Sequence, residues 1–241
     1  HPDGGAIRPR AVLAHVGGIS DNNNAMDTYY SANEDPTMSL EQVNRGYFDP
    51  SGADYSASRN FVDGGPEARF RYTNMGYSLL GSLVESASGT DFSDWSAANI
   101  FGPLGMQHTS WRVSDFDLSE LAEPTTWVGG NWQPEGHTTF ADFPNGGLRS
   151  SAHDMACFMA MAARGGTLYG TQILKMDDLH AMMDPAYPAL APDQGLGWGY
   201  EDLGDPQEWV GHSGGELGVA SDFYMNQSGE LGFVLVTNGD W

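Results

Sequence analysis

Apolar residues recur along the chain with two different periods, and the change of period separates a helical part from a strand-forming part. Between residues 75 and 87 they fall on one face of a helix, which Gly89 is predicted to end. Beyond residue 195 the pattern becomes strand-like and predicts a hairpin of Val219–Asn226, a turn at residues 227–229, and Leu231–Thr237. Helices early and strands late together predict an α+β fold. The apolar helix face consists of Met75, Leu79, Leu80, Leu83, Val84 and Ala87.

Capping patterns predict where two more helices begin. Ser39 followed by Gln42 is a capping box, in which each side chain hydrogen-bonds the other residue's backbone, and this helix should run to about Phe48. Ser151 followed by Asp154 has the same spacing and opens a helix that should end at a glycine pair. Three shorter helices are predicted over residues 11–16, 92–100 and 179–183.

Two long stretches, residues 49–69 and 107–145, show no clear periodicity and are predicted to be loops. The second stretch carries Trp111, Trp127 and Trp132. Aromatic side chains in a long loop either line a pocket or fix the loop to the core. The sequence alone leaves both interpretations of the three tryptophans open.

Length and charge limit the possible functions. The 241 residues suffice for one large domain or two lobes sharing a core, and no run of about 18 apolar residues predicts a membrane span. The chain has 10 basic and 32 acidic residues, and its formal net charge of −22 argues against nucleic acid or an anionic membrane as partner. A strongly solvated surface, as in salt-tolerant proteins, is the favoured interpretation, and a cationic partner is the alternative. The single cysteine, Cys157, excludes an intrachain disulfide and is predicted to be buried.

The run Trp209–Gly215 is the first candidate for chemistry. Its GHSGG sequence matches G-x-S-x-G, the nucleophile elbow of α/β-hydrolases, but that motif needs a helix after the serine and a later histidine. Strand-like sequence follows Ser213, and His212 is the last histidine of the chain, so the elbow interpretation is disfavoured. The glycines instead predict one wall of an active-site cleft, where substrate lies against bare backbone. The seven histidines form no H-x-x-x-H pair, and no metal site is predicted.

Tyr72 and Asn74 are the second candidate. They lie two residues apart in an extended segment that directly precedes a helix, so both side chains can point into one space. A tyrosine serves as a general acid or base when neighbouring cations lower its pKa from about 10. On these residues alone, a structural hydrogen-bonded tyrosine is the favoured interpretation.

Several stretches resemble one family, in that family's order. The segment Phe70–Gly81 resembles the second motif region of the serine β-lactamase and penicillin-binding-protein-like family, in its class C branch with the related esterases and D-stereospecific peptidases. The resemblance implies a β-lactamase/transpeptidase-like fold, with a helical lobe and loops over about residues 1–140 and a helix plus antiparallel sheet over about 141–241. Further matching stretches are Arg10–Gly18, Pro103–Met106, Asn145–Met155, Gly195–Trp198, His212–Gly214 and Thr237–Asn238.

The resemblance also implies roles for individual residues in acyl transfer. Tyr72 would relay a proton to and from the nucleophilic serine, and Asn74 would hydrogen-bond a lysine and the substrate. His212 would replace the lysine of the family's third motif, orienting Tyr72 or meeting a substrate carboxylate. The backbone N–H of Gly215 would supply half of an oxyanion hole. The residues implied to bind substrate are Ser213 and Gly214.

One family motif has no match in the chain. The family's nucleophile is the serine of Ser-x-x-Lys, whereas the only lysine here, Lys175, follows Gln172 at that spacing. We therefore expect residues 1–241 to be the C-terminal two thirds of one such domain, truncated at the N-terminus and at the C-terminus. The isolated chain is then expected to be inactive, with its nucleophile supplied by the missing N-terminal segment. A non-catalytic binding or regulatory relative that has lost its nucleophile is the alternative.

Expectations about ligands and location follow from the same resemblance. It implies a small-molecule substrate, either an ester, a D-amino-acid amide or a β-lactam, and no cofactor. A histidine in the third motif weakens the expected hold on a β-lactam carboxylate, so an esterase or peptidase is favoured. The resemblance favours a periplasmic or secreted location and leaves the cytoplasm open.

Overall fold

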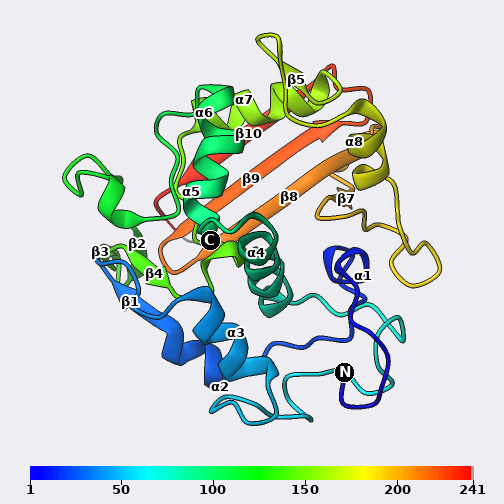
Figure 1. Ribbon diagram of the computed structural model, residues 1–241. Helices are drawn as coiled ribbons and strands as arrows, with labels where there is room; N and C mark the ends of the chain where they lie inside the picture. The colour runs from blue at the N-terminus through cyan, green and yellow to red at the C-terminus, as the bar shows by residue number, and fades with distance from the viewer. Residues whose placement is uncertain (240–241) are drawn as a thin grey trace.

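An antiparallel sheet of four strands forms the centre of the computed structural model, which describes residues 1–239 (Figure 1). The order is β10-β9-β8-β7, so the predicted hairpin is the β9–β10 pair. Helix α7 packs on β9 and β10, and Figure 1 shows α5, α6 and α7 across one face of the sheet. Helices and an antiparallel sheet occur together as the sequence predicted. The strands are β7 (Gly199–Glu201), β8 (Trp209–Glu216), β9 (Val219–Asn226) and β10 (Gly232–Thr237).

The remaining elements lie mostly before this sheet in the chain. The helices are α1 (Pro9–Leu13), α2 (Asn23–Met26), α3 (Leu40–Phe48), α4 (Asn74–Ser88), α5 (Phe92–Ser96), α6 (Gly102–Leu104), α7 (Ala152–Ala163) and α8 (Met176–Met183). Three pairs of short strands are β1 (Tyr30–Ala32) with β4 (Thr138–Phe140), β2 (Thr125–Val128) with β3 (Asn131–Pro134), and β5 (Thr167–Leu168) with β6 (Thr171–Gln172). Short helical turns are η1 (Asp27–Tyr29), η2 (Ala97–Phe101, a π turn), η3 (Val113–Asp115) and η4 (Phe143–Asn145).

The predicted helix caps are confirmed. The Ser39 hydroxyl accepts from the Gln42 N–H at 3.3 Å, while the Gln42 side chain accepts from the Ser39 N–H at 2.9 Å. The Ser151 hydroxyl accepts from the Asp154 N–H at 3.1 Å and caps α7. Gly89 ends α4 in a left-handed conformation, with φ of 70°. Local sequence therefore decides where these helices begin and end.

Two helix predictions need correction. The helix predicted over residues 92–100 does not stop before Gly102 but continues through the π turn η2 into α6, and Gly105 ends it with φ of 72°. Pro103 lies near the C-terminal end of this continuous helix, two residues before Gly105. The first helix begins at Pro9, earlier than predicted, and ends at Leu13.

The stretch 107–145 was predicted to be a loop, which is wrong in part because it contains β2, β3 and β4. Trp127 and Trp132 face each other across the β2–β3 pair, with ring centroids 5.1 Å apart, and both are exposed. Trp111 instead packs against a buried cluster with Phe101 and also lines a cavity of about 250 Å³. Cross-strand pairing of two tryptophans is what the single-sequence pattern missed.

The buried face of α4 differs from the apolar stripe that predicted the helix. Its fully buried positions include small residues, because Gly81 approaches Pro144 and Ser78 faces Asn44 of α3. At its C-terminal end Leu83 is exposed. The helix itself was predicted correctly, and close backbone approach adds to the core packing of Met75, Leu79 and Leu80.

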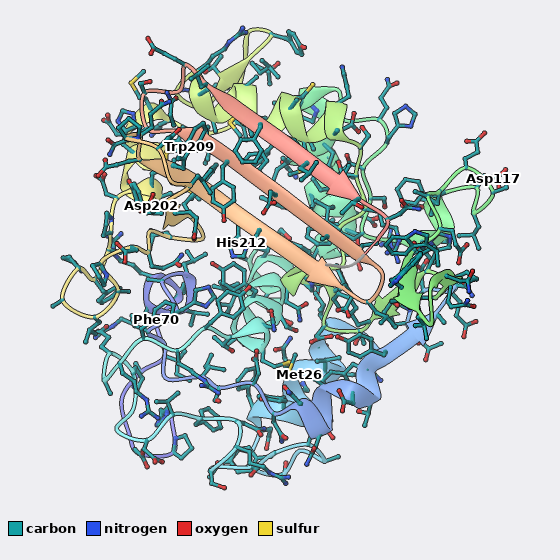
Figure 2. All side chains as sticks on the ribbon, turned by 180° about the vertical axis from the view of Figure 1, so that it is seen from behind. Met26, Phe70, Asp117, Asp202, Trp209 and His212 are labelled. Atoms are coloured by element: carbon teal, nitrogen blue, oxygen red, sulfur yellow. The ribbon has the colours of Figure 1, made fainter. Side chains whose placement is uncertain are left out.

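Three further features concern the fold as a whole. Cys157 is buried as predicted. Within residues 1–239, no helix combines the length and apolar character needed to cross a membrane. Seen from behind in Figure 2, the long strands β8, β9 and β10 lie in front with no helix over them, and Phe233 and Leu235 of β10 are exposed on this outer face.

Candidate functional site

The N-terminus of α4 and the middle of β8 meet at one point. The rings of Tyr72 and His212 lie 6.1 Å apart, although 140 residues separate them in sequence. Figure 2 labels His212 on β8. Strand β7 pairs only with Trp209–Gly211, so β8 has a second edge without a strand partner in residues 1–239 from His212 onward. Tyr72 lies beside this open edge.

The pairing register decides which backbone groups of β8 face the open edge. Just before β8, the carbonyl of Glu208 accepts from the N–H of Gln227 at 3.2 Å, on the β9 side. Backbone groups alternate between the two sides of an antiparallel strand. Even-numbered residues of β8 therefore bond to β9, while Ser213 and Gly215 present their N–H and carbonyl groups to the open edge. Strand β8 thus offers Gly215 N–H as a free donor.

Side chains alternate between the two faces of the sheet. His212 lies opposite Phe223, on the face where Val210 and Met225 pack against α7. Ser213 points to the opposite, outer face and lies beside Tyr224. The Ser213 side chain thus lies on the face opposite His212, while its backbone faces the open edge, and its expected contact with substrate stays a prediction.

The glycines of this run have different reasons to be glycine. A side chain at Gly211 would collide with the carbonyl oxygen of Phe223, and one at Gly214 would begin 2.7 Å from the Ser221 hydroxyl. Gly214 bonds toward β9, so its backbone does not face the open edge, and its expected contact with substrate stays a prediction. At Gly215 a side chain would meet nothing within 4 Å. Only Gly215 has open space around it.

Tyr72 is half-buried, with 44% of its surface exposed. Burial raises the pKa of its hydroxyl, and the Asp21 carboxylate raises that pKa further. In this environment Tyr72 holds its proton. Its ring packs against His15, with centroids 4.3 Å apart, and His15 in turn stacks on Tyr77 at 5.2 Å.

Asn74 is the first residue of α4, and the Asp21 carboxylate fixes its position. The backbone N–H and the side-chain amide of Asn74 both donate to Oδ2 of Asp21, at 2.8 and 3.1 Å. The Asn74 amide oxygen is then directed away from Asp21. The expected partners of Asn74, a lysine and a substrate, would meet that oxygen.

Carboxylates lie beyond Gly215, at the end of β8 and in the helical part beside it. The Tyr30 hydroxyl donates to Oε2 of Glu216 at 3.1 Å, which bridges the helical part and β8. Asp142 is only 2% exposed, and burial raises its pKa to about 6, with Asp21 and Glu216 adding to the rise. Asn145 donates to Oδ2 of Asp142 at 2.7 Å, whereas Oδ1 has no partner among the described residues. The region around Glu216 and Asp142 is therefore electronegative.

Sequence reasoning singled out Tyr72, Asn74, His212 and Gly215, and the structure places Tyr72 beside His212 at the β8 edge on which Gly215 also lies. It missed His15 and Asp21, which contact the Tyr72–Asn74 segment directly. The only signal for them was the looser motif match at Arg10–Gly18 and the adjacent turn. No group of three or more His, Cys, Asp or Glu side chains in residues 1–239 is arranged to hold a metal ion.

Comparisons with known proteins agree on one family. The family model described as Beta-lactamase matches residues 1–240. "Beta-lactamase-like protein 4" of Dictyostelium discoideum is 32% identical over 106 residues, or 41% of this chain and 18% of that protein. "Putative D-alanyl-D-alanine carboxypeptidase" of Escherichia coli strain K12 is 28% identical over 103 residues, or 42% of this chain and 23% of that protein.

The fold is shared with solved structures. D-amino acid amidase from Ochrobactrum anthropi SV3, complexed with L-phenylalanine amide, superposes with a TM-score of 0.72 at 22% sequence identity. The match covers 96% of this chain and 64% of that one. The stretches matched in the two curated relatives make up less than a quarter of each.

Proposed function

Because the chain belongs to the beta-lactamase family, we propose that it forms most of a serine hydrolase that works through an acyl-enzyme. A serine attacks an ester or amide carbonyl, the leaving group departs, and water then releases the acyl group. The nucleophile and its lysine come from a segment outside the 241 residues, since these contain no Ser-x-x-Lys. The 241 residues alone are then inactive.

The observation that carries this proposal is the approach of the Tyr72 ring to the His212 ring at the open edge of β8, with Asn74 two residues from Tyr72 and Gly215 three residues from His212 in the chain. These are the groups that acyl transfer needs: a proton carrier, an amide to hold an amine, a second ionisable ring and an oxyanion donor. A purely structural tyrosine would not need an unpaired strand edge beside it.

Each residue has one step. The serine proton passes, directly or through the lysine, to Tyr72, which delivers it to the leaving group. Asn74 accepts a hydrogen bond from the lysine ammonium through its amide oxygen. Gly215 N–H donates to the carbonyl oxygen as negative charge develops there, and one such donor is typically worth about 2.7–4 kcal/mol in the transition state.

Tyr72 can lose its proton only if nearby cations lower the pKa of its hydroxyl. Burial and Asp21 both raise the pKa of Tyr72, so the phenolate is disfavoured within this chain. A lysine ammonium from the missing segment would oppose this rise. We assign His212, whose ring lies 6.1 Å from that of Tyr72, an orienting role toward Tyr72.

The carboxylates of Glu216 and Asp142, beyond Gly215, favour one substrate class. Glu216 follows Gly215 directly, so the acyl group of a bound substrate lies near Glu216 and Asp142. Carboxylates there repel the anionic group of a β-lactam and favour an uncharged or amine-bearing acyl group. Two of the similar proteins are described as a D-amino acid amidase and a putative D-alanyl-D-alanine carboxypeptidase. We propose D-amino-acid amides or related esters as substrates.

The same proposal assigns an occupant to the outer face of the sheet. Exposed Phe233 and Leu235, and the unpaired edge of β10, would be covered by the segment that carries the nucleophile. The chain covers 64% of the amidase structure, so about a third of that fold has no counterpart here, which supports a segment of the same protein as the occupant.

The test is covalent labelling followed by intact mass measurement. A fluorophosphonate should add one adduct to the whole protein that carries this chain, at a serine outside residues 1–241, and none to the 241-residue chain by itself. An adduct on the isolated chain, for instance at Ser213, would overturn the assignment of the nucleophile. Failure of the whole protein to react would favour the non-catalytic relative instead.

A further inference from the structure

His15 and Asp21, which belong to one short segment, accept hydrogen bonds from the start of α4. The N–H of Thr73 donates to Nδ1 of His15 at 3.2 Å, and the Thr73 hydroxyl donates to Oδ1 of Asp21 at 2.8 Å. The N–H of Met75 donates to the same oxygen at 3.0 Å, and Asn74 donates twice to Oδ2. His15 and Asp21 therefore hold the backbone directly after Tyr72 at two points.

We propose that His15 and Asp21 are positioning residues, which fix the Tyr72 ring and the Asn74 amide in the orientation that acyl transfer requires. This role rests on the proposed function, because it has meaning only if Tyr72 and Asn74 act on a substrate. Neither residue needs to touch substrate itself. His15 is only 2% exposed, and the Asp21 oxygens are occupied by the start of α4.

His15 acts through stacking and through one acceptor. Its ring packs against both Tyr72 and Tyr77, so the Tyr72 ring cannot shift without changing this contact. The Thr73 hydrogen bond requires Nδ1 without a proton, and burial and the charge of His212 lower the pKa of His15 to about 4. A neutral ring behind Tyr72 therefore persists over the ordinary working range of pH.

Asp21 acts on the orientation of the Asn74 amide. An asparagine amide can turn by 180° and exchange its oxygen with its nitrogen. The carboxylate of Asp21 accepts only, so it selects the nitrogen and turns the oxygen outward, toward the place of the lysine. Its charge also suits the N-terminus of the 15-residue helix α4, where backbone N–H groups lack helical partners.

The experiment compares variants of the whole protein that carries this chain. Asp21→Asn replaces an acceptor by a donor, and His15→Asn keeps an acceptor, tolerates the left-handed φ of 55° at this position, and removes the ring. Tyr72→Phe tests the proposed function itself. Asp91→Asn is the matched control, because Asp91 also caps a helix by accepting two backbone N–H groups, those of Ser93 and Asp94.

The expected result is a loss in kcat with little change in KM. Misplacing a catalytic group by about 1 Å can cost about 100-fold, so Asp21→Asn should lower kcat about 100-fold and His15→Asn about tenfold. The amide protons of Asn74 and Met75 should exchange faster in Asp21→Asn while the rest of α4 keeps its protection. Asp91→Asn should leave kcat unchanged.

The outcomes separate the two proposals. If Tyr72→Phe lowers kcat but Asp21→Asn and His15→Asn keep the wild-type kcat, this inference is wrong and the proposed function stands. If Tyr72→Phe has no effect on kcat, both the inference and the proposed function are wrong. Should Asp21→Asn fail to fold, His15→Asn decides alone, because it keeps the Thr73 hydrogen bond and changes only the ring behind Tyr72.

Discussion

Replacing Asp142 by asparagine should change how the stability of the protein depends on pH. The carboxyl is buried, and its pKa is raised from 3.8 to about 6, mainly by burial. The folded protein therefore binds this proton more tightly than the unfolded chain does. Between these two pKa values the folded state holds more protons, so stability falls as the pH rises. The amide introduced by Asp142→Asn cannot titrate and removes that dependence.

The magnitude follows from the shift. About two pKa units at about 1.36 kcal/mol each give about 3 kcal/mol, which the wild type loses between about pH 4 and pH 7 relative to Asp142→Asn. The asparagine also introduces an N–H₂ group where Oδ1 has no partner, at a cost of about 1–3 kcal/mol. That cost is independent of pH. The test is therefore how the difference in unfolding free energy between the wild type and Asp142→Asn changes with pH.

The assay is urea unfolding followed by circular dichroism at several pH values, with free energies extrapolated to water. Asp178→Asn, on the exposed side of α8, removes a carboxylate of the same charge and corrects for the altered net charge. A difference between wild type and Asp142→Asn that stays constant from pH 4 to pH 7 would refute the reasoning. It would mean that Asp142 is ionised in the folded protein without penalty.

Three other changes follow from the same structure. Gly81→Ala should destabilise the protein by about 1–3 kcal/mol in urea unfolding, because its methyl group would lie 2.5 Å from Cγ of Pro144; equal stability of Gly81→Ala and the exposed control Ser86→Ala would contradict this. Ser39→Ala should cost about 1 kcal/mol through loss of the capping box, and an unchanged midpoint would argue that the cap contributes nothing. The pKa of His15 is lowered by folding, whereas that of Asp142 is raised, so the pH dependence has the opposite sign. The free energy of unfolding should fall by about 3 kcal/mol as the pH drops from 6.5 to 4, and His15→Asn should not show this loss. Plots of unfolding free energy against pH that run parallel for the two proteins would contradict this.

The features that the sequence predicted are those encoded locally. The capping box at Ser39, the cap at Ser151 and the left-handed Gly89 each depend on residues within one turn, and all three are present. The hairpin of β9 and β10 likewise follows from alternation and a short turn. Recognition of Tyr72 and Asn74 relied on a longer motif, which carries information that local physics does not.

What the sequence could not predict depends on contacts between distant residues. Ser78 and Gly81 of α4 are buried because Asn44 and Pro144 approach from elsewhere in the chain, and no periodicity reveals that. The same limit applies to Asp21, whose four donors begin about 50 residues later. The direction of the Ser213 side chain followed only once the β8–β9 register was known.

The most direct test of the account is the effect of Tyr72→Phe on hydrolysis of a D-amino-acid amide by the whole protein. Tyr169→Phe is the control, because Tyr169 is 76% exposed. If Tyr72 carries the proton in acyl transfer, Tyr72→Phe should lower kcat/KM by about 10²- to 10⁴-fold, and Tyr169→Phe should leave it unchanged. Equal rates for the two variants and the wild type would contradict the assignment of the Tyr72–His212 edge as the active site.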